Sequence, residues 1–191
     1  KFPTPPSTPH PAGIAPAAQS ETTAPTKTTA PTPTVTPTPI PLVRIEQGEE
    51  ALFNGDYERA VNEFRAAYQG STDRDVQAAA LVGQGRTFTE WDNYSLALSN
   101  LKRVVSEFAD SRSLPDAYFA LGQTYMATYQ YDLAADAYAK YLELRPSPLA
   151  AYVHQQRGEA FYQAGQYQEA IDAFQAAVDT QEATNLIGLQ T

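Results

Sequence analysis

The chain has 191 residues, a formal net charge of −9 at pH 7 and no cysteine. The lack of cysteine excludes disulfide bonds, thiolate metal sites and cysteine nucleophiles. The acidic excess argues against nucleic acid and anionic membrane surfaces as partners, because both attract cationic patches. No stretch of the sequence approaches the roughly 18 consecutive apolar residues of a membrane-spanning helix, so we predict no transmembrane segment.

Residues 1–43 are predicted to be a disordered, Pro/Thr-rich linker or tether. Residues 1–41 hold 12 of the 15 prolines, 11 threonines and only three charged side chains. Such a composition has little apolar surface to offset chain entropy, and its Thr-Pro alternation favours an extended polyproline-II spacer. We interpret it as a tether to a possible membrane anchor upstream of Lys1. The alternative is a linker with no specific role.

From residue 44 onward the sequence repeats itself. Four glycines recur at intervals of 37, 37 and 36 residues, and a helix-period run containing an alanine follows each one. A glycine inside a helix costs about 1 kcal/mol, and we expect close approach of two helices, small residue facing small residue, to offset that cost. The glycines are Gly48, Gly85, Gly122 and Gly158, and the alanines are Ala60, Ala97, Ala134 and Ala170. We predict four helical hairpins, at about residues 44–74, 78–111, 115–148 and 151–180.

The third copy gives the clearest pattern, which is Tyr118, Leu121, Gly122, Tyr125, Tyr131, Ala134, Tyr138 and Pro146. It resembles the tetratricopeptide repeat. The resemblance covers Ile45 to about Asp179 and implies an all-α fold, an α-solenoid whose helical hairpins form a right-handed superhelix. The segments at residues 108–118 and 144–152 look like the subtype found in bacterial envelope proteins. They imply an exported, lipoprotein-like protein, membrane-anchored by the N-terminal tether or secreted.

Residues 181–191 are predicted to form a partial or capping helix. They look like the start of another first helix, although Gly188 follows Gly158 by only 30 residues. This apolar end suggests that the native protein continues beyond Thr191, and the alternative is a frayed solvating helix.

In the resembled family, first helices line a concave groove that binds peptides or helices. Aromatic and amide side chains at the inward positions suit an extended peptide. The predicted groove-binding residues are Glu49, Phe53, Val82, Arg86, Phe119, Gln123, Met126, Tyr152, Gln155, Glu159 and Tyr162. The alternative for any one of the rings is packing between neighbouring repeats. The carboxylate clamp of chaperone-binding members is absent, because Ile45, Glu49 and Gly83 stand at its positions.

We find no catalytic constellation in the sequence. His10 lies in the Pro/Thr tract, and His154 stands alone on a predicted helix, whereas a zinc site needs three or four ligands. We therefore predict no enzyme activity, no cofactor and no metal site. The favoured function is a non-catalytic protein- or peptide-binding scaffold of an exported or cell-envelope bacterial protein. The alternatives are the substrate-guiding helical region of a larger cell-wall enzyme, such as a lytic transglycosylase, and a scaffold that self-associates through its solenoid ends.

Overall fold

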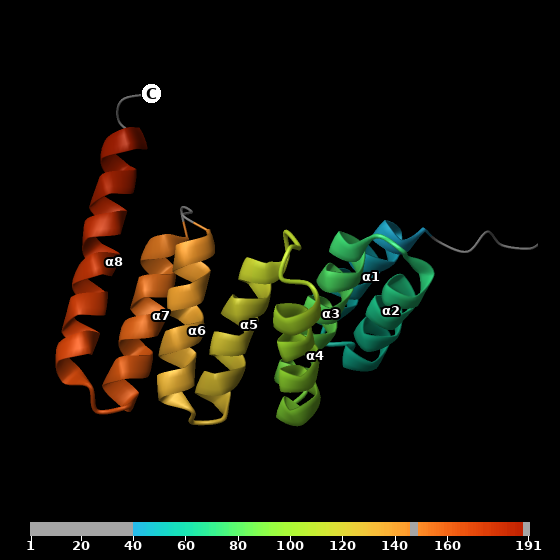
Figure 1. Ribbon diagram of the computed structural model, residues 1–191, viewed down its shortest axis with the longest axis horizontal. Coiled ribbons are helices and arrows are strands. Elements are labelled where there is room, and N and C mark those ends of the chain that lie inside the picture. The colour runs from blue at the N-terminus through green and yellow to red at the C-terminus, as the bar shows by residue number, and fades with distance from the viewer. Residues whose placement is uncertain (1–39, 146–148, 189–191) are drawn as a thin grey trace, which may run out of the picture. The chain divides into compact units, whose positions relative to one another are not determined.

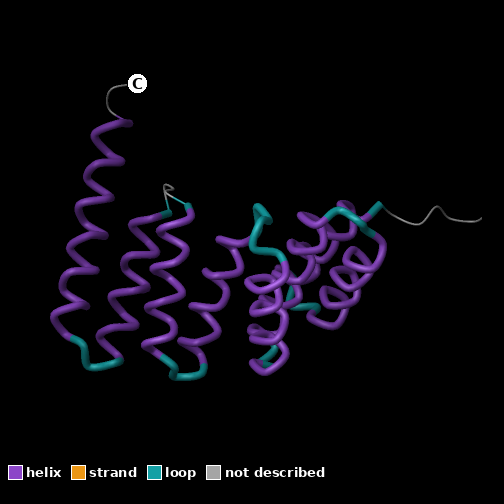
Figure 2. Tube along the Cα trace, in the orientation of Figure 1, coloured by secondary structure: helices purple, strands orange, loops and turns teal. Residues whose placement is uncertain are grey.

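The chain folds into helices that stack as successive antiparallel hairpins (Figure 1). The computed structural model describes residues 40–145 and 149–188, with side chains described as far as residue 181. Every regular element in these two ranges is a helix (Figure 2). The helices are α1 (Pro41–Phe53), α2 (Tyr57–Gly70), α3 (Arg74–Glu90), α4 (Tyr94–Glu107), α5 (Leu114–Ala127), α6 (Tyr131–Leu144), α7 (Ala150–Gln163) and α8 (Tyr167–Gly188). The predicted all-α stack of hairpins is confirmed.

Each helix packs against its neighbours along the chain, and the first helices of the first three hairpins also contact one another in turn. α1 contacts α3, and α3 contacts α5, across the intervening second helices. The first helices of the first three hairpins therefore lie side by side, which positions the site described below. None of the helices in the described ranges is both long and apolar enough to span a membrane.

Polar side chains cap the starts of α2, α3 and α4, and proline starts α1. Pro41 opens α1, where its missing N–H is not needed and its fixed φ suits the first turn. The carboxylates of Asp56 and Asp73 cap α2 and α3 by accepting backbone N–H groups at 3.2 and 2.8 Å. Asn93 caps α4 in the same way at 3.4 Å. Each such cap stabilises its helix by about 0.5–2 kcal/mol.

The turns inside the four hairpins share one backbone shape. In each, a single residue adopts a positive φ: 74° at Gly55, 57° at Asp92, 61° at Tyr129 and 77° at Gly165. Only glycine reaches this region without a steric cost, so Tyr129 carries strain that the two glycine turns avoid. The backbone bonds are also equivalent, since the residue after each turn donates to a carbonyl five residues earlier at 2.8–2.9 Å.

The repeated glycines make room for large side chains of the second helices. A Cβ on Gly48 would collide with the ring of Phe64, and so would a Cβ on Gly83 of the next hairpin. Phe64 is therefore clamped between α1 and α3 and is fully buried. Leu101 and Tyr138 likewise fill the space beside Gly85 and Gly122 of their own hairpins and are fully buried. The four repeat alanines are buried as well, and the proposed contact of small residue with small residue stays a prediction.

The connection between α4 and α5 is fixed by the start of α3. Arg74 pairs with Asp110 at 2.8 Å, and its guanidinium lies over the buried ring of Phe108. Asp75 accepts the backbone N–H of Arg112 and the hydroxyl of Ser111, both at 2.9 Å. These bonds lower the pKa of the Asp75 carboxyl. The extra residues of this loop thus tie the second and third hairpins together.

Several helix limits differ from the predicted ones. α1 starts at Pro41 inside the predicted linker, because proline is well tolerated in a first helical turn. α3 starts at Arg74, earlier than predicted, because Asp73 caps it. α8 continues to Gly188, so residues 181–188 extend the last hairpin and do not begin a separate helix. Residues 1–39, the main part of the predicted linker, lie outside the described residues.

Candidate functional site

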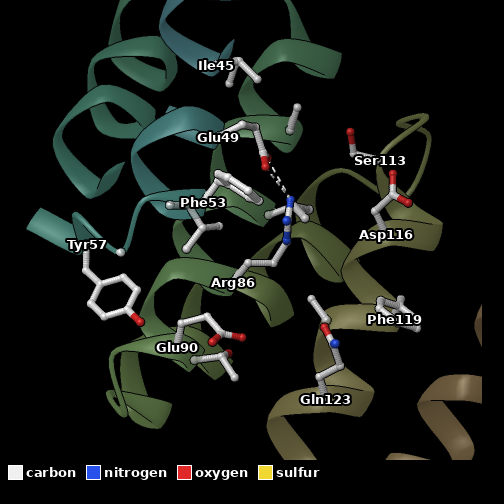
Figure 3. A pocket seen from close by; sticks show the side chains of 16 residues that line it. Ile45, Glu49, Phe53, Tyr57, Arg86, Glu90, Ser113, Asp116, Phe119 and Gln123 are labelled. Carbon is white, nitrogen blue, oxygen red and sulfur yellow. Dashed lines mark hydrogen bonds and ion pairs between the residues drawn. The ribbon is translucent and has the colours of Figure 1, made fainter. Parts of the chain in front are cut away.

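A cavity of about 620 Å³ lies between the first helices of the first three hairpins (Figure 3). We call it the Arg86 groove. Its walls come from α1, α3 and α5, from the turn after α1 and from the start of α5. The lining side chains used below are Ile45, Glu49, Phe53, Tyr57, Val82, Arg86, Thr89, Glu90, Asp116, Phe119 and Gln123. A volume of this size falls within the range of about 300–1,000 Å³ that ligand sites occupy.

An ion pair crosses the upper part of the Arg86 groove. Nη1 of Arg86 donates to both carboxylate oxygens of Glu49, at 2.8 and 3.0 Å (Figure 3). The two residues hold equivalent positions in successive repeats, 37 residues apart. Both side chains are more than 40% exposed, so the pair is weak and a ligand can rearrange it at little cost.

The remaining charge in the Arg86 groove is negative. Asp116 is neutralised by Arg145 at the end of α6, with nitrogen–oxygen distances of 2.6 and 3.3 Å. Glu90, in contrast, forms no ion pair with any residue that the structure describes. The groove therefore presents an uncompensated carboxylate at the end of α3, in a lining that also includes Tyr57 (Figure 3).

Aromatic rings give the groove its apolar surface. Phe53 is 91% exposed, which is unusual for a large apolar side chain held on a helix. The ring of Tyr57 lies 6.2 Å from the ring of Trp91. Phe119 is partly buried and contacts Tyr138 and Tyr141 of α6, with ring centroids 5.9 and 5.6 Å apart. Phe119 thus serves both packing and lining, whereas Phe53 is free to contact a ligand.

A second cavity, of about 520 Å³, lies between α7 and α8, and we call it the Tyr152 groove. Tyr152 and Gln155 stand at the repeat positions of Asp116 and Phe119, so both grooves lie on the first-helix side. Phe174 and Val178 of α8 provide its apolar wall. No charged side chain lines it within the described part of the chain.

The structure distributes the predicted groove residues over three environments. Six line the Arg86 groove: Glu49, Phe53, Val82, Arg86, Phe119 and Gln123. Tyr152 and Gln155 line the Tyr152 groove. The other three, Met126, Glu159 and Tyr162, line neither cavity. Met126 packs on the core, Glu159 accepts a bond from Gln163 at 2.6 Å, and the ring of Tyr162 packs at 5.8 Å from that of Tyr167.

Tyr57 and Asp116 are among the lining residues that the prediction did not include. Tyr57 belongs to the start of α2 and reaches the groove across the turn after α1. Asp116 belongs to the first turn of α5 and is held there by Arg145. The opposite charges at equivalent repeat positions, Glu49 and Arg86, were a readable signal for the ion pair.

Metal and acid–base chemistry find no support in the described ranges. No group of three or more His, Asp or Glu side chains there could hold a metal ion. The Nδ1 of His154 is buried and has no hydrogen-bond partner among the described residues. Burial, and next the nearby Arg157, lower the pKa of His154. The buried Nδ1 of His154 and the nearby Arg157 together favour the neutral imidazole.

Comparison with known proteins gives one family and one group of structures. The family model described as tetratricopeptide repeat matches residues 84–151 and, in an overlapping placement, 119–184, together more than half of the chain. A crystal structure of MamA is 22% identical with a TM-score of 0.62, covering 76% of this chain and 80% of that one. The MamA RS-1 ArsTM double mutant is 23% identical, with a TM-score of 0.60 and coverages of 75% and 76%. At such identities the likeness concerns the fold alone, and no curated protein sequence matches the chain.

Proposed function

The chain belongs to the tetratricopeptide repeat family, a family of protein-binding scaffolds, and from this premise we propose that its Arg86 groove binds an extended peptide segment of a partner protein. The observation that carries the proposal is the cavity of about 620 Å³ between three consecutive first helices. Six side chains at inward-facing repeat positions line it. The proposed role is non-catalytic, as is typical of tetratricopeptide repeat scaffolds.

The walls favour a peptide that combines an apolar side chain with a basic one. An apolar side chain would cover Phe53 and contact Val82, which removes exposed hydrocarbon from water. A lysine or arginine would reach the carboxylate of Glu90 and the face of Tyr57, where ion pairing and cation–π attraction act together. Gln123 and Thr89 supply hydrogen-bonding groups for a peptide backbone.

A peptide selection tests this proposal. A random peptide library displayed on phage is selected against the chain, and the affinity of each enriched peptide is measured by fluorescence polarisation. We expect enriched peptides to carry a basic residue near an apolar one. Phe53→Ala should weaken their binding by roughly tenfold or more, as truncation of an exposed aromatic anchor does at interfaces.

The matched control is Tyr162→Ala, which removes an exposed ring from a first helix outside both cavities. Its affinity for the same peptides should equal that of the unmodified chain. Equal affinities for all three proteins would reject the Arg86 groove as the peptide site.

The cellular setting is a further part of the proposal. We infer that the protein is extracytoplasmic or belongs to a bacterial cell envelope, anchored through its N-terminal tether or secreted. The Pro/Thr-rich composition of residues 1–43 supports this, as does the form of the segments at 108–118 and 144–152. A lipidation or export signal before Lys1 in the complete gene would agree with it, and fractionation of cells with the protein in the cytoplasm would contradict it. A wall-hydrolase domain after Thr191 would instead favour the helical region of a cell-wall enzyme.

Self-association remains a second candidate, and the two ends of the array differ in their suitability. Ile171 of α8 is 60% exposed, whereas its equivalents Val61 and Ala135 are buried beneath the next hairpin. On α1, Glu46 and Glu50 stand where α3 has the buried Gly83 and Thr87. Charged side chains there oppose head-to-tail stacking, so association would pair α8 with α8. Light scattering at two concentrations tests this, and a strictly monomeric chain at high concentration would exclude it.

A further inference from the structure

The three junctions between successive hairpins are built from equivalent positions but differ on the second-helix side. At the first junction, Tyr68 of α2 and Arg103 of α4 bridge from one hairpin to the next. Arg103 donates to the Tyr68 hydroxyl, and its guanidinium carbon lies 5.0 Å from the ring centroid. Nε of Arg103 also bonds Glu107 at 2.8 Å, which fixes the arginine in place. This junction is closed by its own side chains.

The second junction lacks this bridge. Val105 and Lys140 occupy the positions of Tyr68 and Arg103, each 37 residues later. Valine is too short to reach across, and a cavity of about 310 Å³ remains between α4, α5 and α6. We call it the Lys102 groove. Its apolar lining consists of Val105, Tyr118, Leu121, Tyr125, Leu133 and Ala137.

Two lysines stand at the edges of the Lys102 groove. Lys102 forms no ion pair with any described residue, and its Nζ lies 5.7 Å from the ring centroid of Tyr125. Lys140 pairs only with Glu143 on its own helix, at 2.7 Å, and both side chains are more than half exposed. Asp136 is the opposing charge in the lining. Two of the three charged side chains in the lining are therefore lysines, and of these two Lys102 is the one without an ion pair among the described residues, in a chain whose net charge is −9.

The last hairpin shows that this combination is not a general feature of the repeats. A cavity of about 190 Å³ lies there between α7 and α8 and is lined by equivalents of the α5 and α6 residues of the Lys102 groove but, among the described residues, by none of the preceding second helix α6. His154 and Arg157 replace the tyrosine and leucine of the second junction's floor, and Glu169 and Asp172 line the opposite wall. A polar floor with acidic walls would reject both an apolar side chain and a carboxylate.

We propose that the Lys102 groove is a second docking site, which takes a partner segment presenting one large apolar side chain flanked by carboxylates. The apolar side chain lies against Leu121 and Leu133, the latter 44% exposed in the structure. The flanking carboxylates pair with Lys102 and Lys140. The volume is at the lower limit of about 300 Å³ for ligand sites, which fits one or two side chains and not a longer segment.

This site is separate from the proposed peptide groove in both position and charge. The Arg86 groove is formed by α1, α3 and α5 and is net negative, whereas the Lys102 groove opens beside the second helices α4 and α6. The two sites select opposite charges, so one chain could hold a basic segment and an acidic segment at the same time.

The test uses a fluorescein-labelled synthetic peptide with a central phenylalanine between glutamates, and a matched peptide with lysines in place of the glutamates. Fluorescence anisotropy at low salt should show saturable binding of the acidic peptide and much weaker binding of the basic one. The double variant Val105→Tyr/Lys140→Arg rebuilds the bridge of the first junction. It should weaken binding of the acidic peptide by about tenfold or more, because the apolar pocket is filled.

Two further variants keep the result interpretable. Lys102→Glu changes an exposed side chain, so it should leave the melting temperature unchanged and weaken binding of the acidic peptide. Phe53→Ala, in the Arg86 groove, should leave that binding unchanged. Absence of saturable binding, equal affinity for both peptides, or full affinity in the bridged variant would each overturn the proposal.

Discussion

The two cavities on the first-helix side are built on the same repeat frame but offer a ligand different chemistry. The Arg86 groove contains four charged side chains and the fully accessible ring of Phe53. The Tyr152 groove contains tyrosine, glutamine and apolar side chains, and no charge in its described lining. The repeat therefore relates equivalent positions, while single substitutions decide the chemistry of each cavity's lining. On the first-helix side, the charged lining lies in the first three hairpins.

The largest expected effect is a difference in how much the first and the last hairpin lose in stability when a ring is removed. Phe64→Ala removes a fully buried ring between α1 and α3 and should lower the free energy of unfolding by about 3–5 kcal/mol. The equivalent change in the last hairpin, Phe174→Ala, should cost about 1–2 kcal/mol, because this ring is partly exposed. Urea unfolding followed by circular dichroism measures both. Equal losses would show that α8 is as tightly covered as α2.

Charge in the Arg86 groove gives the next largest effect. Glu90→Gln removes the unpaired carboxylate, so binding of a basic peptide should become weaker by about 1 kcal/mol. The affinity should also depend less on the salt concentration. Gln155→Ala in the Tyr152 groove should leave the salt dependence unchanged. Affinities measured at low and high salt compare the two variants. An unchanged salt dependence in Glu90→Gln would mean that the basic residue binds elsewhere.

Substitutions in the hairpin turns should change stability by a smaller amount, and in opposite directions in the third and fourth hairpins. Tyr129 has a φ of 61°, so Tyr129→Gly should relieve strain and raise stability by about 0.5 kcal/mol. The gain is limited because the Tyr129 ring makes an edge contact with Tyr131 at 6.2 Å. Gly165→Ala, with a φ of 77° at the same turn position, should destabilise the chain. Thermal melts check both signs, and a lower melting temperature for Tyr129→Gly would refute the strain argument.

The smallest effect is a pH dependence in the C-terminal half. Burial and Arg157 lower the pKa of His154, while Glu169 and Asp172 face it from α8. The unfolded chain, with an ordinary histidine near 6.5, then binds the proton more readily than the folded chain. Stability should therefore fall slightly as the pH drops through about 6.5. His154→Gln should remove that part of the decline in stability. If the variant and the unmodified chain show the same dependence of stability on pH, the decline comes from other groups.

Much of this architecture could be predicted because the repeat carries its own alignment. The spacing from Gly48 to Gly158 fixed the hairpins, and the family's inward positions selected six of the residues that line the Arg86 groove. The helix limits were less readable, because they depend on single caps such as Asp73. α8 continues through residues 181–188 because no glycine or proline interrupts it before Gly188, so the helix propagates without a break.

The chemistry of the grooves was harder to predict because it depends on neighbours that the repeat frame does not relate. Tyr57 enters the Arg86 groove from a second helix, and Asp116 is neutralised by Arg145 from the far end of α6. The Lys102 groove exists because Val105 is shorter than Tyr68, which matters only once both are seen to span a junction. The partner of Gly83 was also hidden, because its contact, Phe64, belongs to the preceding hairpin.

Site-specific photo-crosslinking tests the central claim most directly. A benzoylphenylalanine placed at Phe53, inside the Arg86 groove, is compared with one at Tyr129, a second strongly exposed aromatic position, which lies on a turn and does not line that groove. Each is irradiated with a peptide enriched in the selection described above, and the adduct is quantified by mass spectrometry. The proposal predicts an adduct at position 53, competed away by unlabelled peptide, and none at position 129. Equal adducts at both positions, or an adduct at 129 alone, would contradict it.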